Sequence, residues 1–512
     1  MMSLRSRFVA ALFGVALCVQ AAPLGDFDGH GDIGAPKIAG SASYDAAGQE
    51  YAITGAGTNM WGTRDEYHWA WKKLSGDFIL RTHAHFLGQG VDPHRKLGWL
   101  IRPNEDADAP YVDIAAHGDG LLSLQYRKVK GGVTRQFVLP LRNADVLQLE
   151  RRGGKVIVSG ARYGETFVAN EIADVDLGDA VLGGLFVCSH NPDVKEQAVF
   201  RDVRVIKPVR ANFVPYREYI GSHLEILDVE TGRLERIHSS AEPFEAPNWT
   251  PDGSALIYNV SGSGPNKGVL HRFDLATRKP AKIDTGFAVN NNNDHVLSFD
   301  GKMMGVSNHS ADMKGQSTIY VLPATGGEPR KVTSLAPSYL HGWSPDAKWL
   351  TYTGGRAEQA GGPLVYSIYK IPVEGGEEVR LTRGDWLDDG PEFSPDGAFI
   401  YFNSTRSGLM QLWRMKPDGS EQEQLTGDGM NNWFPHLSPD GKWIAFISYG
   451  QDVQPADHPY YKHVYIRLLA TDGNSAPRVL AYVYGGQGSI NVPSWSPDGK
   501  KIAFVSNDAF AK

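Results

Sequence analysis

Cysteine is scarce in this chain of 512 residues, which contains only two, Cys18 and Cys188. Cys18 falls in an N-terminal segment that we expect to be removed, so Cys188 would be left without an internal disulfide partner. Its neighbours in Leu185–Cys188 are apolar, which favours a buried and unreactive thiol. The fold therefore cannot depend on disulfides.

A surplus of basic residues is also lacking, because 51 Lys and Arg stand against 58 Asp and Glu, a formal charge of −7. Nucleic-acid binders normally carry a basic face, so this balance argues against that class. Long apolar runs are lacking too, and the run Phe8–Val19 is too short for a stable transmembrane helix. We therefore expect no nucleic-acid partner and no stable membrane insertion.

The N-terminus has the three parts of a secretory signal peptide. Arg5 and Arg7 form the basic region, Phe8–Val19 forms the apolar region, and Gln20–Pro23 supplies small residues at the cleavage site. We predict a signal peptide over residues 1–21. The mature protein is then expected to be periplasmic or secreted.

Residues 26–206 show strand-like alternation without a sustained helical period. Examples are Asp77–Arg81, Leu121–Tyr126 and Lys155–Val158, and turns containing glycine separate such segments. About 180 residues of this kind fit a two-sheet β-sandwich. The segment resembles the concanavalin-like or laminin-G-like sandwiches found beside carbohydrate-active enzymes. We assign residues 22–208 to this predicted domain.

A different pattern begins after Glu218, where an aromatic or apolar residue repeatedly precedes Ser-Pro-Asp-Gly or a near copy of it. The third residues of successive copies are 48, 46, 50, 44 and 58 positions apart, which is the period of a four-stranded propeller blade. Serine, proline and glycine at these places suit a type I turn, and an apolar strand follows. The six copies are Trp249–Gly253, Leu297–Gly301, Trp343–Ala347, Phe393–Gly397, Leu437–Gly441 and Trp495–Gly499.

The six turns predict a closed ring. The first outer hairpin, Leu224–Ile237, precedes any turn repeat, and the last inner pair ends near Ser506 without outer strands. Joining the two completes a sixth blade from both ends of the domain and removes exposed edges. We therefore predict an all-β protein: an N-terminal lectin-like β-sandwich followed by a six-bladed β-propeller over residues 209–512.

The repeat resembles the TolB-type propeller. Asn403–Gly408, followed by Gln411–Met415, is especially similar to that family's blade. The resemblance implies the six-bladed ring already expected from the spacing. TolB proteins carry a different N-terminal domain, so a role in the Tol system is not carried over to this chain.

Polar side chains stand just before the six turns. Loops that lead into the innermost strands share one face of a propeller, and the Ser-Pro-Asp-Gly turns lie on the other. We therefore expect carboxylates, imidazoles and carboxamides from five or six blades to converge on one pocket, with the insertion Tyr449–His463 as a lid or wall. The residues selected for substrate binding are Glu245, Asn248, Asn293, Asp294, Tyr339, Arg356, Asp388, Asn432 and Trp433.

Several chemistries remain open for such a pocket. The residues selected for catalysis are His295, His341, His436, Asp389, Glu392 and Arg406. The histidines, with the arginine neutralising a uronate, would serve a polysaccharide lyase. The acidic residues, facing a further carboxylate across the channel, would serve a glycoside hydrolase. The histidines with Asp389 could instead hold a divalent metal, or the histidines could simply pack the blades.

From this mixture of residues we expect an exported carbohydrate-active protein. It would bind an oligo- or polysaccharide at the channel mouth and cleave it as a hydrolase or lyase. The alternative is a non-catalytic periplasmic binding or scaffold protein whose propeller face holds a protein partner. A narrow polar pocket would favour the first function, and an apolar patch on the rim would favour the second.

Overall fold

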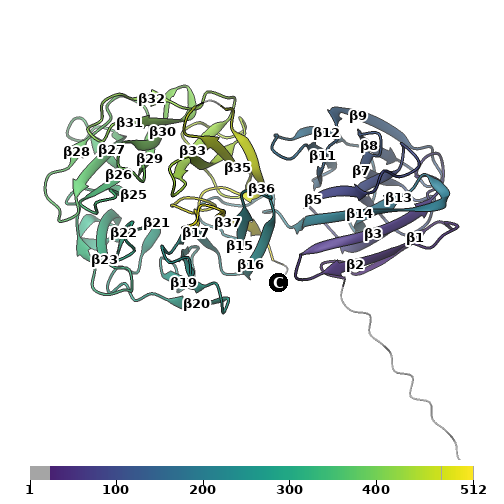
Figure 1. The fold of residues 1–512 in the computed structure, drawn as a ribbon, viewed down its shortest axis with the longest axis horizontal. Coiled ribbons are helices and arrows are strands. Elements are labelled where there is room, and N and C mark those ends of the chain that lie inside the picture. The colour runs from purple at the N-terminus through teal and green to yellow at the C-terminus, as the bar shows by residue number, and fades with distance from the viewer. Residues whose placement is uncertain (1–23, 474, 511–512) are drawn as a thin grey trace, which may run out of the picture.

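The computed structural model describes residues 24–473 and 475–510, so the predicted signal peptide lies outside the described residues. Two β-rich halves lie side by side and are joined by residues 207–220 (Figure 1). Within the described residues the only helical element is the single 3-10 turn η1 (Ala311–Met313), and none forms a helix of the length and apolarity that a bilayer crossing requires. The all-β class is confirmed.

The N-terminal half consists of two antiparallel sheets of seven strands each. Across the first sheet the order is β1 (Gly29–Ile33), β4 (Tyr67–Leu74), β13 (Val181–Cys188), β6 (Lys96–Arg102), β7 (Tyr111–His117), β8 (Leu121–Arg127) and β9 (Arg135–Arg142). Across the second sheet the order is β12 (Val168–Ile172), β11 (Lys155–Ala161), β10 (Val146–Arg152), β5 (Phe78–Leu87), β14 (Asn191–Ile206), β3 (Glu50–Gly57) and β2 (Ser41–Asp45).

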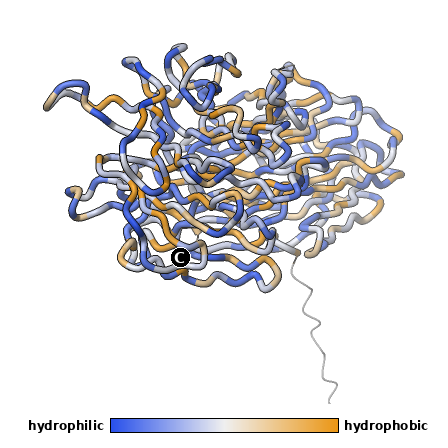
Figure 2. The backbone as a smooth tube through the Cα atoms, turned by 60° about the vertical axis from the view of Figure 1, so that its left-hand side comes forward, coloured by the Kyte–Doolittle hydropathy of each residue, from blue (hydrophilic) through white to orange (hydrophobic). Residues whose placement is uncertain are grey.

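Alternating apolar side chains form the core of this half. Trp99 and Leu124 of the first sheet and Phe200 of the second belong to one fully buried cluster. The tube in Figure 2 shows hydrophobic and hydrophilic residues alternating at short intervals along the chain, as strands with two different faces require. The arrangement is consistent with the predicted β-sandwich. Its kinship with concanavalin-like or laminin-G-like domains stays a prediction.

The C-terminal half is a ring of sheets, five of which have four antiparallel strands within the described residues. From the innermost strand outward, blade 1 is β17 (Phe244–Trp249), β18 (Ala255–Val260), β19 (Leu270–Asp274) and β20 (Lys279–Lys282). Blade 2 is β21 (Asn291–Leu297), β22 (Met303–Ser310), β23 (Gln316–Pro323) and β24 (Arg330–Lys331). Blade 3 is β25 (Ser338–Trp343), β26 (Trp349–Ala357), β27 (Leu364–Pro372) and β28 (Val379–Arg380). Blade 4 is β29 (Asp388–Phe393), β30 (Ile400–Ser407), β31 (Leu409–Met415) and β32 (Glu423–Gln424), and blade 5 is β33 (Asn431–Leu437), β34 (Trp443–Tyr449), β35 (Lys462–Ala470) and β36 (Arg478–Gly485).

The sixth blade closes the ring from both ends of the domain. β37 (Lys501–Asp508) pairs with β15 (Gly221–Asp228), which pairs in turn with β16 (Leu234–Ser240). On the inner side of β37, a single bridge from Trp495 to Ile502 takes the place of an inner strand. The predicted six-bladed propeller with closure by its two ends is confirmed.

The Ser-Pro-Asp-Gly turns connect the first and second strands of the blades. In blade 4 the backbone N–H of Gly397 donates to the carbonyl of Ser394 at 2.8 Å, and the Ser394 hydroxyl donates to Asp396 at 2.6 Å. Gly397 has φ +71°, a conformation that glycine adopts without steric cost. The turns therefore close the end of the propeller at which the inner strands finish.

The two halves contact each other through blades 5 and 6. The Tyr482 hydroxyl donates to the Glu165 carbonyl at 2.7 Å, so a loop of the sandwich covers the outer strand β36. Arg204 at the end of β14 forms a buried ion pair with Glu225 of β15, with 2.6 Å between nitrogen and oxygen. We propose the domain boundary near residue 208, just after β14.

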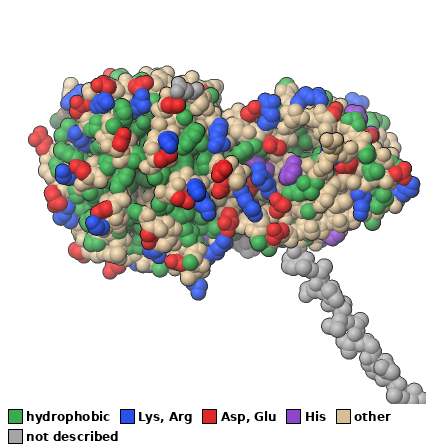
Figure 3. Space-filling model, viewed as in Figure 1, with side chains coloured by type: hydrophobic (Ala, Val, Ile, Leu, Met, Phe, Trp, Pro, Cys, Tyr) green, Lys and Arg blue, Asp and Glu red, His purple; other side chains and the backbone are tan. Residues whose placement is uncertain are grey.

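Basic and acidic side chains are interspersed over both halves on the face seen in Figure 3.

Candidate functional site

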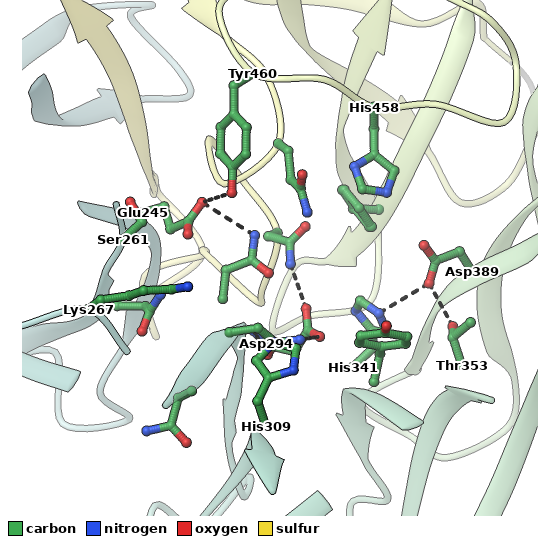
Figure 4. A pocket seen from close by; sticks show the side chains of 18 of the residues that line it. Glu245, Ser261, Lys267, Asp294, His309, His341, Thr353, Asp389, His458 and Tyr460 are labelled. Atoms are coloured by element: carbon green, nitrogen blue, oxygen red, sulfur yellow. Dashed lines mark hydrogen bonds and ion pairs between the residues drawn. The ribbon is translucent and has the colours of Figure 1, made fainter. Parts of the chain in front are cut away.

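A cavity of about 620 Å³ opens at the end of the propeller where the inner strands begin. Six of the selected residues line it, and they come from the inner strands of blades 1 to 4: Glu245, Asn293, Asp294, Tyr339, His341 and Asp389. Blade 5 adds Phe434, and the insertion after β34 adds His458 and Tyr460 as a wall (Figure 4). The structure therefore brings these side chains together at one mouth.

Glu245 occupies one corner of the cavity and is almost fully buried. One carboxylate oxygen accepts hydrogen bonds from the Tyr460 hydroxyl at 3.0 Å and from the Asn293 amide at 3.4 Å. Burial raises the pKa of Glu245 to about 7, although hydrogen bonds from neutral neighbours oppose the rise. None of the described residues forms an ion pair with this carboxylate.

Asp294 lies deeper, beside the sixth blade. Its two oxygens accept hydrogen bonds from the amides of Asn491 at 2.8 Å and Asn292 at 2.7 Å. Burial raises the pKa of Asp294 to about 6; the charge of Asp389 adds to the rise, and the charge of His341 opposes it. Like Glu245, this acid is held by neutral donors.

Asp389 and His341 form the one close acid–base pair in the cavity wall, within the described residues. His341 Nε2 lies 3.2 Å from Asp389 Oδ1, which also accepts from the Thr353 hydroxyl at 2.6 Å. Burial pushes the pKa of Asp389 upward, but His341 outweighs it and holds the pKa at about 2. Burial also disfavours a charged His341, but its bond to Asp389 and the charge of Asp294 raise its pKa overall. Each partner therefore favours the ionised form of the other.

Several carboxamides of the cavity are left with unused acceptors. The side-chain oxygens of Asn259, Asn291 and Asn491 are buried and have no hydrogen-bond partner in the described part of the chain. The amide of Asn491 donates to Asp294, and the amide of Asn291 donates to the carbonyls of Gly268 and Ala288, so their orientations are fixed. Three residues that line the cavity thus keep a buried acceptor without a partner in the described part of the chain.

Four selected residues do not reach the cavity. They lie at the opposite end of the inner strands, between blades: Asn248, His295, Glu392 and His436. Glu392 accepts from the Leu437 N–H at 2.9 Å and contacts His436 Nδ1 at 2.7 Å. Asn248 accepts from the Leu297 N–H at 3.1 Å. The expectation that these side chains share the pocket is therefore wrong, because they join neighbouring blades.

A bulge in the inner strand separates the two positions. The pairing register of blade 4 shifts between Asp389 and Glu392, and equivalent shifts occur in blades 1 and 5. The residue at the bulge has positive φ: 58° at Ala246, 64° at Gly390 and 55° at Phe434. A bulge re-aims the side chains that follow it, here from the channel toward the next blade.

The remaining selected residues are held by contacts within a blade or between adjacent blades, which also departs from the expectation. Arg406 bonds Asp388 at 2.9 Å, and Arg356 bonds Glu378 at 2.7 Å, so both guanidinium groups are already neutralised. Two neighbouring residues of β33 are engaged in packing as well. Asn432 forms hydrogen bonds with polar groups of blades 4 and 5, and Trp433 belongs to an apolar cluster. These five residues form no part of the cavity wall.

Sequence reasoning missed some residues of the wall. Thr353 supports Asp389, while Asn259 lies near the end of β18 and Lys267 lies in the loop between β18 and β19. Loops between second and third strands lie on the pocket face, and this rule applied to blade 1 would have selected both. The described residues contain no group of three or more His, Cys, Asp or Glu placed to hold a metal ion.

Comparison with known proteins gives the family. The sequence profile of the TolB beta propeller domain matches residues 343–460. An uncharacterized protein of Agrobacterium fabrum is 45% identical over 285 residues, which are 56% of this chain and 92% of that protein. A solved structure from Agrobacterium tumefaciens that carries the provisional name TolB is 44% identical with a TM-score of 0.52, covering 58% of this chain and 100% of that one.

More distant relatives of this chain are named as TolB proteins of the Tol-Pal system. The Tol-Pal system protein TolB of Bordetella pertussis is 25% identical over 278 residues, which are 54% of this chain and 55% of that protein. This chain therefore spans about half the length of the TolB proteins that it matches.

These relatives correct the expected function. The sequence led us to expect a carbohydrate-active hydrolase or lyase, whereas the similar proteins are TolB-like and favour the non-catalytic alternative. A polar cavity does not decide the matter, because polypeptides and sugars are both bound through hydrogen bonds. By its matched residues, its identity to the Agrobacterium proteins and its six blades, the chain belongs to the TolB-like β-propeller family.

Proposed function

We propose that this protein is a non-catalytic binding protein whose propeller cavity holds a segment of a protein partner. The TolB of Bordetella pertussis is named as a protein of the Tol-Pal system, which motivates a protein partner here. In this proposal Glu245, Asn293, Asp294 and Tyr339 contact the partner, and His341 holds Asp389 in place. The predicted signal peptide would place this activity in the periplasm or outside the cell.

The pocket side of blades 2 and 3 carries the observation that supports this proposal best. Phe287 is 54% exposed and Val289 47%, both in the loop that leads into β21. Leu335 is 48% exposed in the loop that leads into β25, and Leu364 is exposed at the start of β27. These segments all run on the pocket side of blades 2 and 3. Exposed apolar side chains on the same face as a polar opening are typical of a surface that docks another protein.

Site-specific photo-crosslinking tests this function on two matched phenylalanines. Phe287 on the pocket side and Phe299 in the turn of the same blade are both well exposed, the latter at 44%. Each is replaced by benzoylphenylalanine, and the variant is irradiated in the cells that normally make the protein. We expect a discrete polypeptide adduct from position 287 and none from position 299. Absence of the adduct at 287, or equal adducts at both positions, would contradict the proposal.

A further inference from the structure

Negative charge in the cavity is only partly neutralised. Asp389 is paired with His341, but Glu245 and Asp294 are held by neutral hydroxyl and amide groups alone. Lys267 lies exposed at the wall and forms no ion pair with either acid among the described residues. The nearby positive charge of His341 acts on Asp294 but is already paired with Asp389, so ionising both buried carboxylates is costly unless a ligand supplies a further positive charge. The charge pattern therefore favours a cationic ligand.

The hydrogen-bonding pattern specifies the cation further. Asn259 and Asn491 use their amide N–H groups on Glu245 and Asp294, which leaves both side-chain oxygens buried without a partner. The Asn291 oxygen is also without one. Carboxylates and carboxamide oxygens are all acceptors, so the best occupant brings several donors. An ammonium group carries three N–H donors and a guanidinium group carries five.

A groove next to the cavity indicates what carries this cation. A second depression of about 1010 Å³ shares Tyr219, Ser261 and Gly262 with the cavity wall. Its other walls are the sandwich turn Ser75–Asp77 and the segment that connects the two halves, residues 207–220. The groove therefore adjoins the cavity, and a chain that flanks the bound group has somewhere to lie. A small free amine would fill the cavity alone and would make no contact with the groove.

We propose that the cavity binds a lysine or arginine side chain of the partner, and that the partner residues flanking it lie in the groove between the sandwich and blade 1. This inference rests on the proposed function, and it adds the chemistry of the partner. It also gives the sandwich a part in binding, through Ser75–Asp77, that the propeller alone does not provide.

Binding of a cation to these acids is expected to depend on pH. The free protein holds Glu245 at a pKa of about 7 and Asp294 at about 6, so both acids bind protons below neutrality. A cation needs them ionised, so protons must leave on binding and affinity rises with pH. The titratable groups around the two acids are Tyr219, Lys267, His309, Tyr339, His341, Asp389, His458 and Tyr460. Asp389, with a pKa of about 2, and a peptide lysine both stay charged in this range.

The direct test compares three probes by saturation-transfer NMR at pH 8. They are the acetylated and amidated pentapeptide Gly-Ser-Lys-Ser-Gly, its norleucine counterpart, and N-acetyl-lysinamide. We expect the lysine peptide to bind at least about tenfold more tightly than the other two, and about tenfold more weakly at pH 5.5, since Glu245 must then lose a proton. Equal binding of the lysine and norleucine peptides, or no binding of the lysine peptide, overturns the inference. N-acetyl-lysinamide binding as tightly as the lysine peptide overturns the part played by the groove.

Matched variants locate the effect. The double variant Glu245→Gln/Asp294→Asn removes both free acids and is expected to abolish the preference for lysine. The control variant Glu230→Gln/Glu377→Gln removes two exposed acids outside the cavity and should keep the preference, with both variants first shown to be folded by circular dichroism. Failure of the proposed function appears separately, as loss of the adduct at position 287. An adduct that persists undiminished in the Glu245→Gln/Asp294→Asn variant keeps that function and overturns the cationic anchor.

Discussion

Polar residues at the two ends of the propeller's inner strands differ in what satisfies them. At the pocket end, Glu245 and Asp294 accept hydrogen bonds from neutral side chains and form no ion pair in the described part of the chain. At the turn end, Asn248 and Glu392 accept from backbone N–H groups of the neighbouring blade. The first pair is open to a ligand, and the second pair is already saturated by the fold.

This difference shows that the type of a polar residue does not decide whether it lines the cavity or joins two blades. Asp389 and Glu392 stand three positions apart in one strand, yet one faces the cavity and the other joins blade 4 to blade 5. The bulge between them decides which role each acid takes. Substitutions at the two ends should therefore separate stability from binding.

The largest effect is expected at the turn end, from Glu392→Ala. The substitution leaves the Leu437 N–H and His436 Nδ1 buried without their partner, and each such loss costs roughly 1–3 kcal/mol. We expect the free energy of unfolding to fall by about 4 kcal/mol, measured by urea denaturation at pH 7. Glu377→Ala, at an exposed acid, serves as the control and should change stability by less than about 0.5 kcal/mol. A loss below about 1 kcal/mol for Glu392→Ala would show that this contact does not hold the blades together.

A smaller effect is expected when two asparagines at opposite ends are compared. Asn248→Ala removes the acceptor of the Leu297 N–H and the donor to the Pro493 carbonyl, so we expect a loss of about 2 kcal/mol. Asn293→Ala removes one long contact of 3.4 Å to Glu245 and should cost less than about 1 kcal/mol. Thermal unfolding of both variants beside the wild type measures the difference. Equal losses would break the distinction between the two ends.

The sequence was sufficient to predict the six-bladed ring. The motif spacing and the unpaired hairpin Leu224–Ile237 predicted six blades and their closure, because the period of a blade leaves one arrangement without free edges. The shared pocket face followed from the way loops enter inner strands, and six of the selected residues do line the cavity. Neither result needed side-chain detail.

The bulges were not anticipated, although the sequence carries a sign of them. Pro247, Pro391 and Pro435 each follow the residue with positive φ in blades 1, 4 and 5. Proline inside a sheet is confined to edges and bulges, so a repeated proline in inner strands marks the break in alternation. Without that reading, Glu392 and His436 looked equivalent to the residues of the cavity.

The function could not be derived from residue types. Amides, acids and imidazoles suit a sugar as well as a peptide, and the apolar residues of the rim loops gave no sign of their exposure. Phe287 and Leu335 could equally have been buried under neighbouring loops, and the folded rim shows that they are not. The motifs did indicate the TolB-like propeller, but only the similarity of the whole domain to TolB-like proteins favoured the non-catalytic alternative.

The smallest effect sharpens the comparison from the pocket end. Burial raises the pKa of Glu245 from its ordinary 4.5 to about 7, so the folded state binds this proton more tightly than the unfolded state. Stability is therefore lost as pH rises from about 4.5 through 7, and the full loss is present at pH 8. Glu245→Gln keeps an acceptor for Tyr460 and removes a charge whose burial costs about 3 kcal/mol at pH 8. The buried amide group of the new side chain offsets part of this gain, so we expect a net stabilisation of about 1 kcal/mol at pH 8 and none at pH 5. Urea denaturation at the two pH values, with Glu377→Gln as the exposed control, measures this gain. A variant that is less stable than the wild type at pH 8 would mean that the folded protein itself stabilises the Glu245 carboxylate, as it does that of Glu392. The carboxylate would then need no ligand.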